Sequence, residues 1–127
     1  MTGVDESKVA RYGSAQFSRD VIERFPELGE ALRSNANLLR LQIETLATAI
    51  RSEISAGDTY LAIEICVFLN EMLEDRGASA EMENALAFSF IEPHELRRTA
   101  AGRFLLRSMP ARVRQILLKH EAEIGEW

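Results

Sequence analysis

The sequence has one cysteine, three prolines and no long apolar run, and these shortages limit the structures and functions that it can have. Cys66 has no partner for an intramolecular disulfide, and its apolar neighbours predict a buried, unreactive thiol. Residues 1–13 carry no apolar run after their charges. We therefore expect no signal peptide, no membrane span and a cytoplasmic protein. No stretch alternates apolar and polar residues with β-branched enrichment, which disfavours strands.

Signatures of catalysis and metal binding are also missing. The glycines are scattered through turns, so no phosphate-cradling loop is predicted. A di-iron bundle needs paired Glu-x-x-His motifs, whereas His120 and Glu123 run in reverse order and occur once. The spacing of Cys66, His94 and His120 matches no short chelating motif. We predict no catalytic residue, metal or cofactor, with His94 on the surface and His120 at the edge of the core. The alternative is a metal-dependent or small-molecule-binding enzyme or sensor that uses the two histidines and nearby carboxylates.

What is present is typical of one soluble globular domain. The chain has 127 residues, of which 46% are hydrophobic and 28% charged. Residues 1–13 are small and polar with weak periodicity, which predicts a flexible arm. Residues 14–127 are expected to form a single helical domain.

The stretch from Asp58 to Asp75 predicts a helix with almost no solvent side. Leu61, Ile65, Phe68 and Met72 share one stripe at about 100° per residue, and further apolar residues widen it. A helix this apolar should be surrounded by other helices. It is therefore expected at the centre of the fold.

Other amphipathic stretches supply the partners of that helix. The turn at Gly57 and Asp58 predicts an antiparallel hairpin, with Gly57 in the left-handed conformation and Asp58 as the cap. The last residues of the fourth helix, Phe88 to Ile91, are apolar on every side and should be deeply buried. Asn70 and Ser89 should satisfy backbone groups or bridge helices. The fold is predicted to be all-α, with about six helices in a compact bundle or a short stack of antiparallel hairpins. Besides 58–75, the expected helices are Ser14 to Phe25, with Pro26 ending it or opening a new turn, then about 37–55, 79–91, 93–108, and one from Pro110 onward.

Charge is unevenly distributed along the chain. Residues 44–95 hold eleven acids and two arginines, a net of −9, whereas residues 97–119 hold six arginines, one lysine and no acid, a net of +7. One interpretation is that the basic helices pack beside the acidic ones and their fields offset each other. The other is that the blocks are exposed as docking surfaces.

The docking interpretation leads to two sets of candidate residues. The acidic set would bind a basic protein partner, and the basic set would bind an anion. A nucleic-acid partner is disfavoured because Phe104 is the only aromatic residue in the basic stretch and the chain is acidic overall. A monomer and a homodimer both fit the apolar stripes. The acidic set is Glu64, Glu71, Asp75, Glu81 and Glu83. The basic set is Arg97, Arg98, Arg103, Arg107, Arg112 and Arg114.

Several short runs resemble a group of small uncharacterised bacterial helical domains. In that group a Gly-Asp turn, a leucine-rich helix, an asparagine-containing helix and a final helix follow one another. The similarity covers roughly residues 41–126. The resemblance implies an accessory protein, in some cases of the immunity type that neutralises a toxin from a neighbouring cell. It implies no catalytic residue. The runs that carry it are Ser55-Ala56-Gly57-Asp58, Leu69-Asn70-Glu71-Met72-Leu73, Glu83-Asn84-Ala85-Leu86-Ala87-Phe88-Ser89-Phe90-Ile91-Glu92 and Met109-Pro110-Ala111-Arg112.

Overall fold

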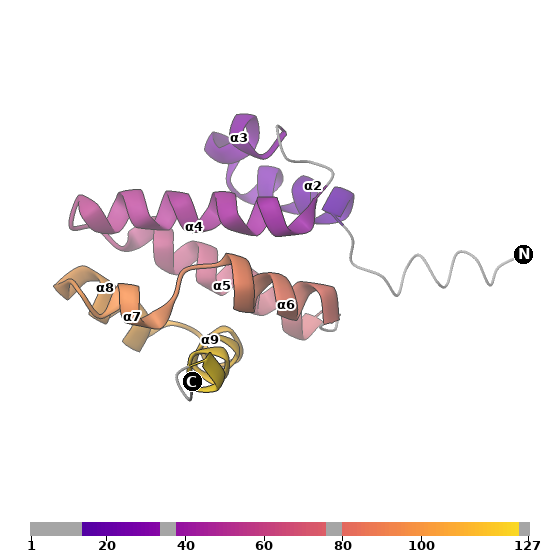
Figure 1. Cartoon of the computed structure of the whole chain (residues 1–127). Coiled ribbons are helices and arrows are strands. Elements are labelled where there is room, and N and C mark those ends of the chain that lie inside the picture. Colours follow the sequence, from indigo (N-terminus) through magenta and orange to yellow (C-terminus); the bar gives the residue numbers. More distant parts are fainter. Residues whose placement is uncertain (1–13, 34–37, 76–79, 125–127) are drawn as a thin grey trace, which may run out of the picture.

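The structure is a computed structural model that describes residues 14–33, 38–75 and 80–124. Within these ranges every regular element is helical, which confirms the all-α prediction (Figure 1). No helix in the described ranges is long and apolar enough to cross a bilayer. The elements are α2 (Ser14–Arg24), the 3-10 turn η1 (Pro26–Leu28), α3 (Gly29–Arg33), α4 (Leu39–Ser55), α5 (Tyr60–Asp75), α6 (Ala80–Ser89), α7 (Pro93–Leu96), α8 (Ala100–Ser108) and α9 (Ala111–Ile124).

Four helices, α4, α5, α6 and α9, form a closed ring around the core. Helix α4 packs on α5 and α6, and α9 packs on the same two helices from the other side. In Figure 1, α4 lies across the view and α9 is seen nearly along its axis, so the two helices cross. Helices α5 and α6 therefore stand at opposite corners of the ring. Exposed side chains on α5 and on α6 therefore have different neighbours.

Helix α5 is enclosed as its sequence predicts. No residue from Leu61 to Met72 is exposed, and Ile65, Cys66 and Leu69 are fully buried. Its neighbours are α4, α8 and α9, and Phe68 also contacts α2. The rings of Phe17 and Phe68 lie 6.2 Å apart, and those of Phe25 and Phe68 lie 5.8 Å apart, edge to face. Such aromatic pairs add to the free energy gained by burial.

The hairpin between α4 and α5 is held by backbone geometry and by two carboxylates. Gly57 has φ +81°, as predicted from its position after a helix. Asp58 accepts hydrogen bonds from the backbone N–H groups of Thr59 and Tyr60. The sequence did not reveal a second cap. The carboxylate of Glu53, at the end of α4, accepts the N–H groups of Leu61 and Ala62 at 2.9 and 2.5 Å. An anion at this position also complements the positive end of the α5 dipole.

The described residues form eight α-helices, slightly more than the six or so that the sequence predicts. Pro26 starts η1, and the short α3 follows it. The single helix expected over 93–108 is two helices, α7 and α8. The Thr99 hydroxyl accepts from the Gly102 N–H at 2.9 Å and caps α8. A Cβ on Gly102 would lie 2.1 Å from the Leu96 carbonyl oxygen, so only glycine permits this corner.

Asn70 bridges two helices, as expected of a polar residue beside an apolar face. Its Oδ1 accepts from the N–H groups of Arg112 and Val113 at 3.0 and 3.3 Å. These N–H groups belong to the first turn of α9, which has no helical acceptors for them. Asn70 of α5 therefore caps α9. The flexible arm predicted for 1–13, and the helix signals Gly77 and Ser79, lie outside the described residues.

Gln42 on α4 is buried although no pattern in the sequence predicted it. Its side chain is fully buried, and neither Oε1 nor Nε2 has a hydrogen-bond partner among the residues that the structure describes. A buried amide without partners costs free energy, since its hydrogen bonds to water are lost and not replaced.

Candidate functional site

The five predicted acidic residues lie on two helices at opposite corners of the ring. Glu64 and Glu71 are on α5, and the α5 residue Asp75 has a side chain outside what the structure describes. Glu71 pairs with Arg24 of α2 at 3.4 Å, and Glu83 of α6 pairs with Arg112 of α9 at 2.6 Å. The other two are Glu64 and Glu81, which have no ion pair with any described residue. Glu81 is exposed, whereas Glu64 is half-buried.

The six predicted arginines differ as much in their surroundings. Arg112 is the one that pairs, among the described residues, with the acidic stretch of residues 44–95. Arg97 pairs instead with Glu121 of α9 at 2.7 Å. Arg103 donates to the Arg97 carbonyl oxygen at 3.0 Å, so its charge is not neutralised by a carboxylate. The other three have no ion-pair partner among the described residues. They are Arg98, Arg107 and Arg114.

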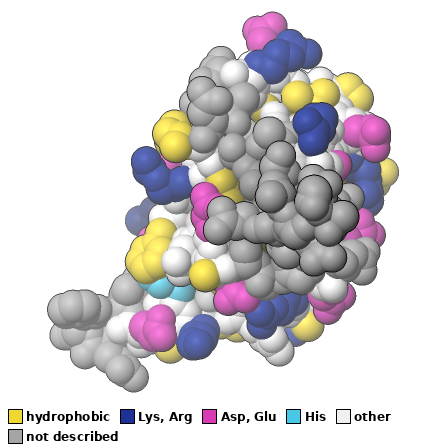
Figure 2. All heavy atoms as spheres, turned by 90° about the vertical axis from the view of Figure 1, so that its right-hand side faces the viewer, with side chains coloured by type: hydrophobic (Ala, Val, Ile, Leu, Met, Phe, Trp, Pro, Cys, Tyr) yellow, Lys and Arg dark blue, Asp and Glu magenta, His cyan; other side chains and the backbone are white. Residues whose placement is uncertain are grey.

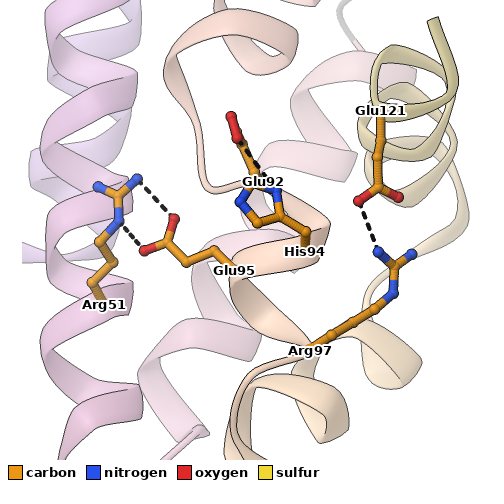
Figure 3. A network of polar contacts seen from close by, with 6 residues as sticks. All are labelled: Arg51, Glu92, His94, Glu95, Arg97 and Glu121. Carbon is orange, nitrogen blue, oxygen red and sulfur yellow. Dashed lines mark hydrogen bonds and ion pairs between the residues drawn. The ribbon is translucent and has the colours of Figure 1, made fainter. Parts of the chain in front are cut away.

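Ion pairs around α7 link three helices (Figure 3). Arg51 of α4 donates to both oxygens of Glu95 at 2.7 and 3.3 Å. The Arg97 guanidinium beside Glu121 holds the pKa of that carboxyl below its usual value. His94 Nδ1 lies 3.6 Å from Glu92, and the His94 side chain is exposed as predicted. These contacts fix α7 between α4 and α9, which is a structural role.

The residues that could bind a metal do not gather. Among residues 14–33, 38–75 and 80–124, no group of three or more His, Cys, Asp or Glu side chains could hold an ion. Cys66 is buried in α5, and burial raises the pKa of its thiol to about 12. The thiol is therefore protonated at neutral pH. His94 and His120 nevertheless line one small pocket together with Glu92 and Glu121, so the alternative of an enzyme or sensor that uses the two histidines stays a prediction.

Phe88 contradicts the expectation that the end of α6 is buried on every side. Phe90 and Ile91 are buried, but the Phe88 side chain is 71% exposed. It lies on the outward stripe of α6 with Glu81 and Asn84, which are also exposed. Because α6 ends at Ser89, the apolar run at its end is only partly helical. Phe88 itself lies inside α6, one turn from Asn84 and two turns from Glu81, so the helical spacing turns it outward although its sequence neighbours are apolar.

Phe88 stands between two hollows. One lies toward α9 and is lined in part by Lys119, His120 and Glu123, and the other lies toward α4 and is lined by Arg40 and Glu81. The His120 ring packs on Phe88 with centroids 4.4 Å apart. His120 is half-buried, as expected at the edge of the core. Figure 2 shows histidine atoms beside exposed apolar side chains on one face of the molecule. We call the following set the Phe88 surface: Glu81, Asn84, Phe88, His120 and Glu123.

Rigid neighbours position this surface. Helix α6 packs on α4 and α9 through the buried side chains of Met82 and Leu86. Helix α9 is fixed at its start by Asn70 and by the Arg112–Glu83 pair. Glu81 and Glu123 are exposed and have no ion pair with a described residue, so carboxylates flank the exposed ring.

Residues 18–124 match DUF7674, a domain of unknown function. The match covers most of the chain, and the chain therefore belongs to this family. No significant match was found among curated proteins or among solved structures.

Proposed function

We propose that this chain is a non-enzymatic protein-interaction module that binds a basic protein partner through the Phe88 surface. The observation that carries the proposal is the 71% exposure of Phe88 on a well-packed helix. Exposed aromatic residues on rigid elements serve as anchors in protein interfaces, where a few residues contribute most of the binding energy. The hollows on either side of Phe88 offer places for partner side chains.

The sign of the partner's charge follows from the carboxylates of this surface. Glu81 and Glu123 are exposed and not ion-paired within the described chain, so they are free to meet cations. Arg40 and Lys119 border the hollows, and they would orient the partner by repelling misplaced basic groups. Of the five acids predicted from sequence, Glu81 fits this role best. Glu64 would contribute only to the long-range field.

A more specific form of the proposal comes from the resemblance of the sequence to immunity-type accessory proteins. In that form the chain is a cytoplasmic immunity protein, and its partner is a toxin with a basic surface that the module covers. An acidic inhibitor would associate rapidly with such a surface at low salt and more slowly as salt rises.

The test compares two exposed aromatic residues. Phe88→Ala removes the proposed anchor, and Tyr60→Ala is the matched control because Tyr60 is 74% exposed on α5. Immobilised wild-type chain and both variants are incubated with extract of the native host, and retained proteins are identified by mass spectrometry. The proposal expects a protein that wild type and Tyr60→Ala retain and that Phe88→Ala loses. With the purified partner, Phe88→Ala should weaken binding about 30-fold, as for a hot-spot residue.

Charge is tested separately with Glu81→Arg combined with Glu123→Arg. This variant should slow association and flatten its dependence on salt. A partner that binds all variants with wild-type affinity would overturn the proposal. Neutralisation of that partner's toxicity by the wild-type chain, and not by Phe88→Ala, would support the immunity form.

A further inference from the structure

Helix α8 presents a second exposed face that differs from the Phe88 surface. Ala100, Phe104 and Ser108 lie one above another on this face, and all three are exposed. Phe104 is 46% exposed. Gly102 and Leu105 are buried on the opposite side, where α8 packs on α7 and α5. The outward stripe therefore consists of one aromatic residue between two small ones.

Positive charge lines one edge of that stripe. Arg103 and Arg107 are exposed one turn apart, and Arg98 is exposed just before the helix. None of the three pairs with a carboxylate in the described part of the chain, whereas Arg97 is neutralised by Glu121. The sequence has no acid between Arg97 and Lys119. We call Arg98, Ala100, Arg103, Phe104, Arg107 and Ser108 the α8 surface.

We propose that the α8 surface docks an acidic helical segment of a second protein. A carboxylate pair spaced one turn apart on a partner helix would meet Arg103 and Arg107, whose spacing is the same. Ala100 and Ser108 are small, so a partner helix can approach closely on both sides of the Phe104 ring. Helix α8 has nine residues and is about 14 Å long, which suits roughly two turns of a partner.

Rigidity and charge favour this occupant over a nucleic acid. The Thr99 cap and the close contact of Gly102 with Leu96 hold α8 at a fixed angle to α7. A single aromatic residue can stack only one base, and the net charge of −5 repels a long polyanion. A short acidic segment needs only the local charge of this face. The partner of the α8 surface is acidic, whereas the partner proposed for the Phe88 surface is basic. This inference therefore does not depend on the proposed function.

The experiment uses three fluorescent probes in anisotropy titrations at low salt. The first is a short alanine-based helical peptide with one leucine and glutamates one turn apart on the same face. The second has the same composition with the glutamates spread around the helix. The third is a short single-stranded oligothymidine. The first peptide is expected to bind wild type about fivefold more tightly than the second, because only its acids can meet both arginines.

Variants then separate charge from shape. Arg103→Glu with Arg107→Glu should weaken the first peptide at least about tenfold, and Phe104→Ala about fivefold. The matched control is Arg40→Glu with Lys119→Glu, which changes net charge equally but lies beside Phe88 and should leave binding nearly unchanged. Circular dichroism checks folding, and Arg103→Gln with Arg107→Gln replaces the reversal if that variant unfolds.

Three results would overturn the proposal. The first is no binding of the first peptide, and the second is equal binding of the two peptides. The third is tighter binding of oligothymidine with loss on Phe104→Ala, which would assign the α8 surface to single-stranded nucleic acid instead.

Discussion

Phe88 and Phe104 are both exposed phenylalanines on short helices, but their surroundings differ. Phe88 lies between two hollows, contacts a histidine ring and has free carboxylates beside it. Phe104 lies on a helix face beside arginines that have no carboxylate partner within the described part of the chain. Helix α6 packs on α4 and α9, whereas α8 packs on α7 and α5. Exposure alone does not distinguish these rings from Tyr60, which is 74% exposed, so it is the neighbours of each ring that indicate which partner would fit.

The largest expected effect is that of Gly102→Ala, which should disturb the α8 surface and leave the Phe88 surface intact. In Gly102→Ala the new methyl would lie 2.1 Å from the Leu96 carbonyl oxygen, so α7 and α8 must move apart. We expect a loss of about 3 kcal/mol in the free energy of unfolding, measured by urea titration. The remaining folded protein should lose acidic-peptide binding and keep binding through Phe88.

Gly57→Ala is the control for this substitution. The new methyl group would have no atom within 4 Å, but Gly57 has a positive φ that alanine rarely adopts. Gly57→Ala should therefore lower the free energy of unfolding by about 1 kcal/mol. Equal stabilities of the two variants would show that the α7–α8 corner can relax.

Removal of the Asn70 cap should affect the Phe88 surface more than the α8 surface. Asn70→Ala leaves the N–H groups of Arg112 and Val113 without their acceptor and should cost about 1–2 kcal/mol. Helix α9, which carries His120, should show faster amide hydrogen exchange. Asn70→Asp keeps an acceptor and adds a favourable charge at a helix N-terminus, so it should restore most of the loss. Equal losses in the two variants would contradict the capping role.

Gln42 belongs to neither surface, and its substitution by methionine should raise the free energy of unfolding rather than lower it. Gln42→Met replaces an amide without partners by an apolar side chain of similar size. We expect a gain of about 1 kcal/mol, seen as a higher urea midpoint. A lower midpoint would mean that the amide is satisfied. In this background, a binding loss on Phe88→Ala cannot be attributed to unfolding.

The smallest expected effect comes from Glu121, whose pKa is lowered mainly by its hydrogen bond with Arg97. A carboxyl with a lowered pKa stabilises the fold when ionised, and this contribution is lost as pH falls through its folded pKa. Glu121→Gln should therefore cost about 0.5 kcal/mol at neutral pH, and the difference should shrink below the ordinary value of 4.5. A difference that persists in acid would exclude the ion pair as its cause. The freed Arg97 should slightly strengthen acidic-peptide binding.

Periodicity predicted the parts of the fold that depend on regular helices. The apolar stripes of 39–54 and 58–75 are buried, because long amphipathic helices must cover their apolar faces. Periodicity did not predict where one helix ends and the next begins. Thr99 caps a new helix inside the stretch 93–108, which was expected to be one continuous helix.

The candidate surfaces were harder to predict for the same reason. Phe88 belongs to an apolar run, and the prediction followed the composition of that run rather than the helical spacing that puts Phe88 on the same face as Glu81 and Asn84. The predicted acids were chosen by charge, but pairing of Glu71 and Glu83 depends on which helices become neighbours. Glu81, Arg103 and Arg107 are exposed, a point that the charge pattern left open between internal packing and docking surfaces. Their role in binding remains a prediction.

The Glu53 carboxylate accepts two hydrogen bonds from the start of α5, and these bonds have a consequence for the rate of folding. It joins residues only eight and nine positions apart, so its loop closes with little loss of chain entropy. The α4–α5 pair can therefore form as an early folding nucleus on which later helices assemble. Glu53→Gln should then slow refolding more than it speeds unfolding in stopped-flow measurements, whereas a change in unfolding alone would place this contact after the rate-limiting step.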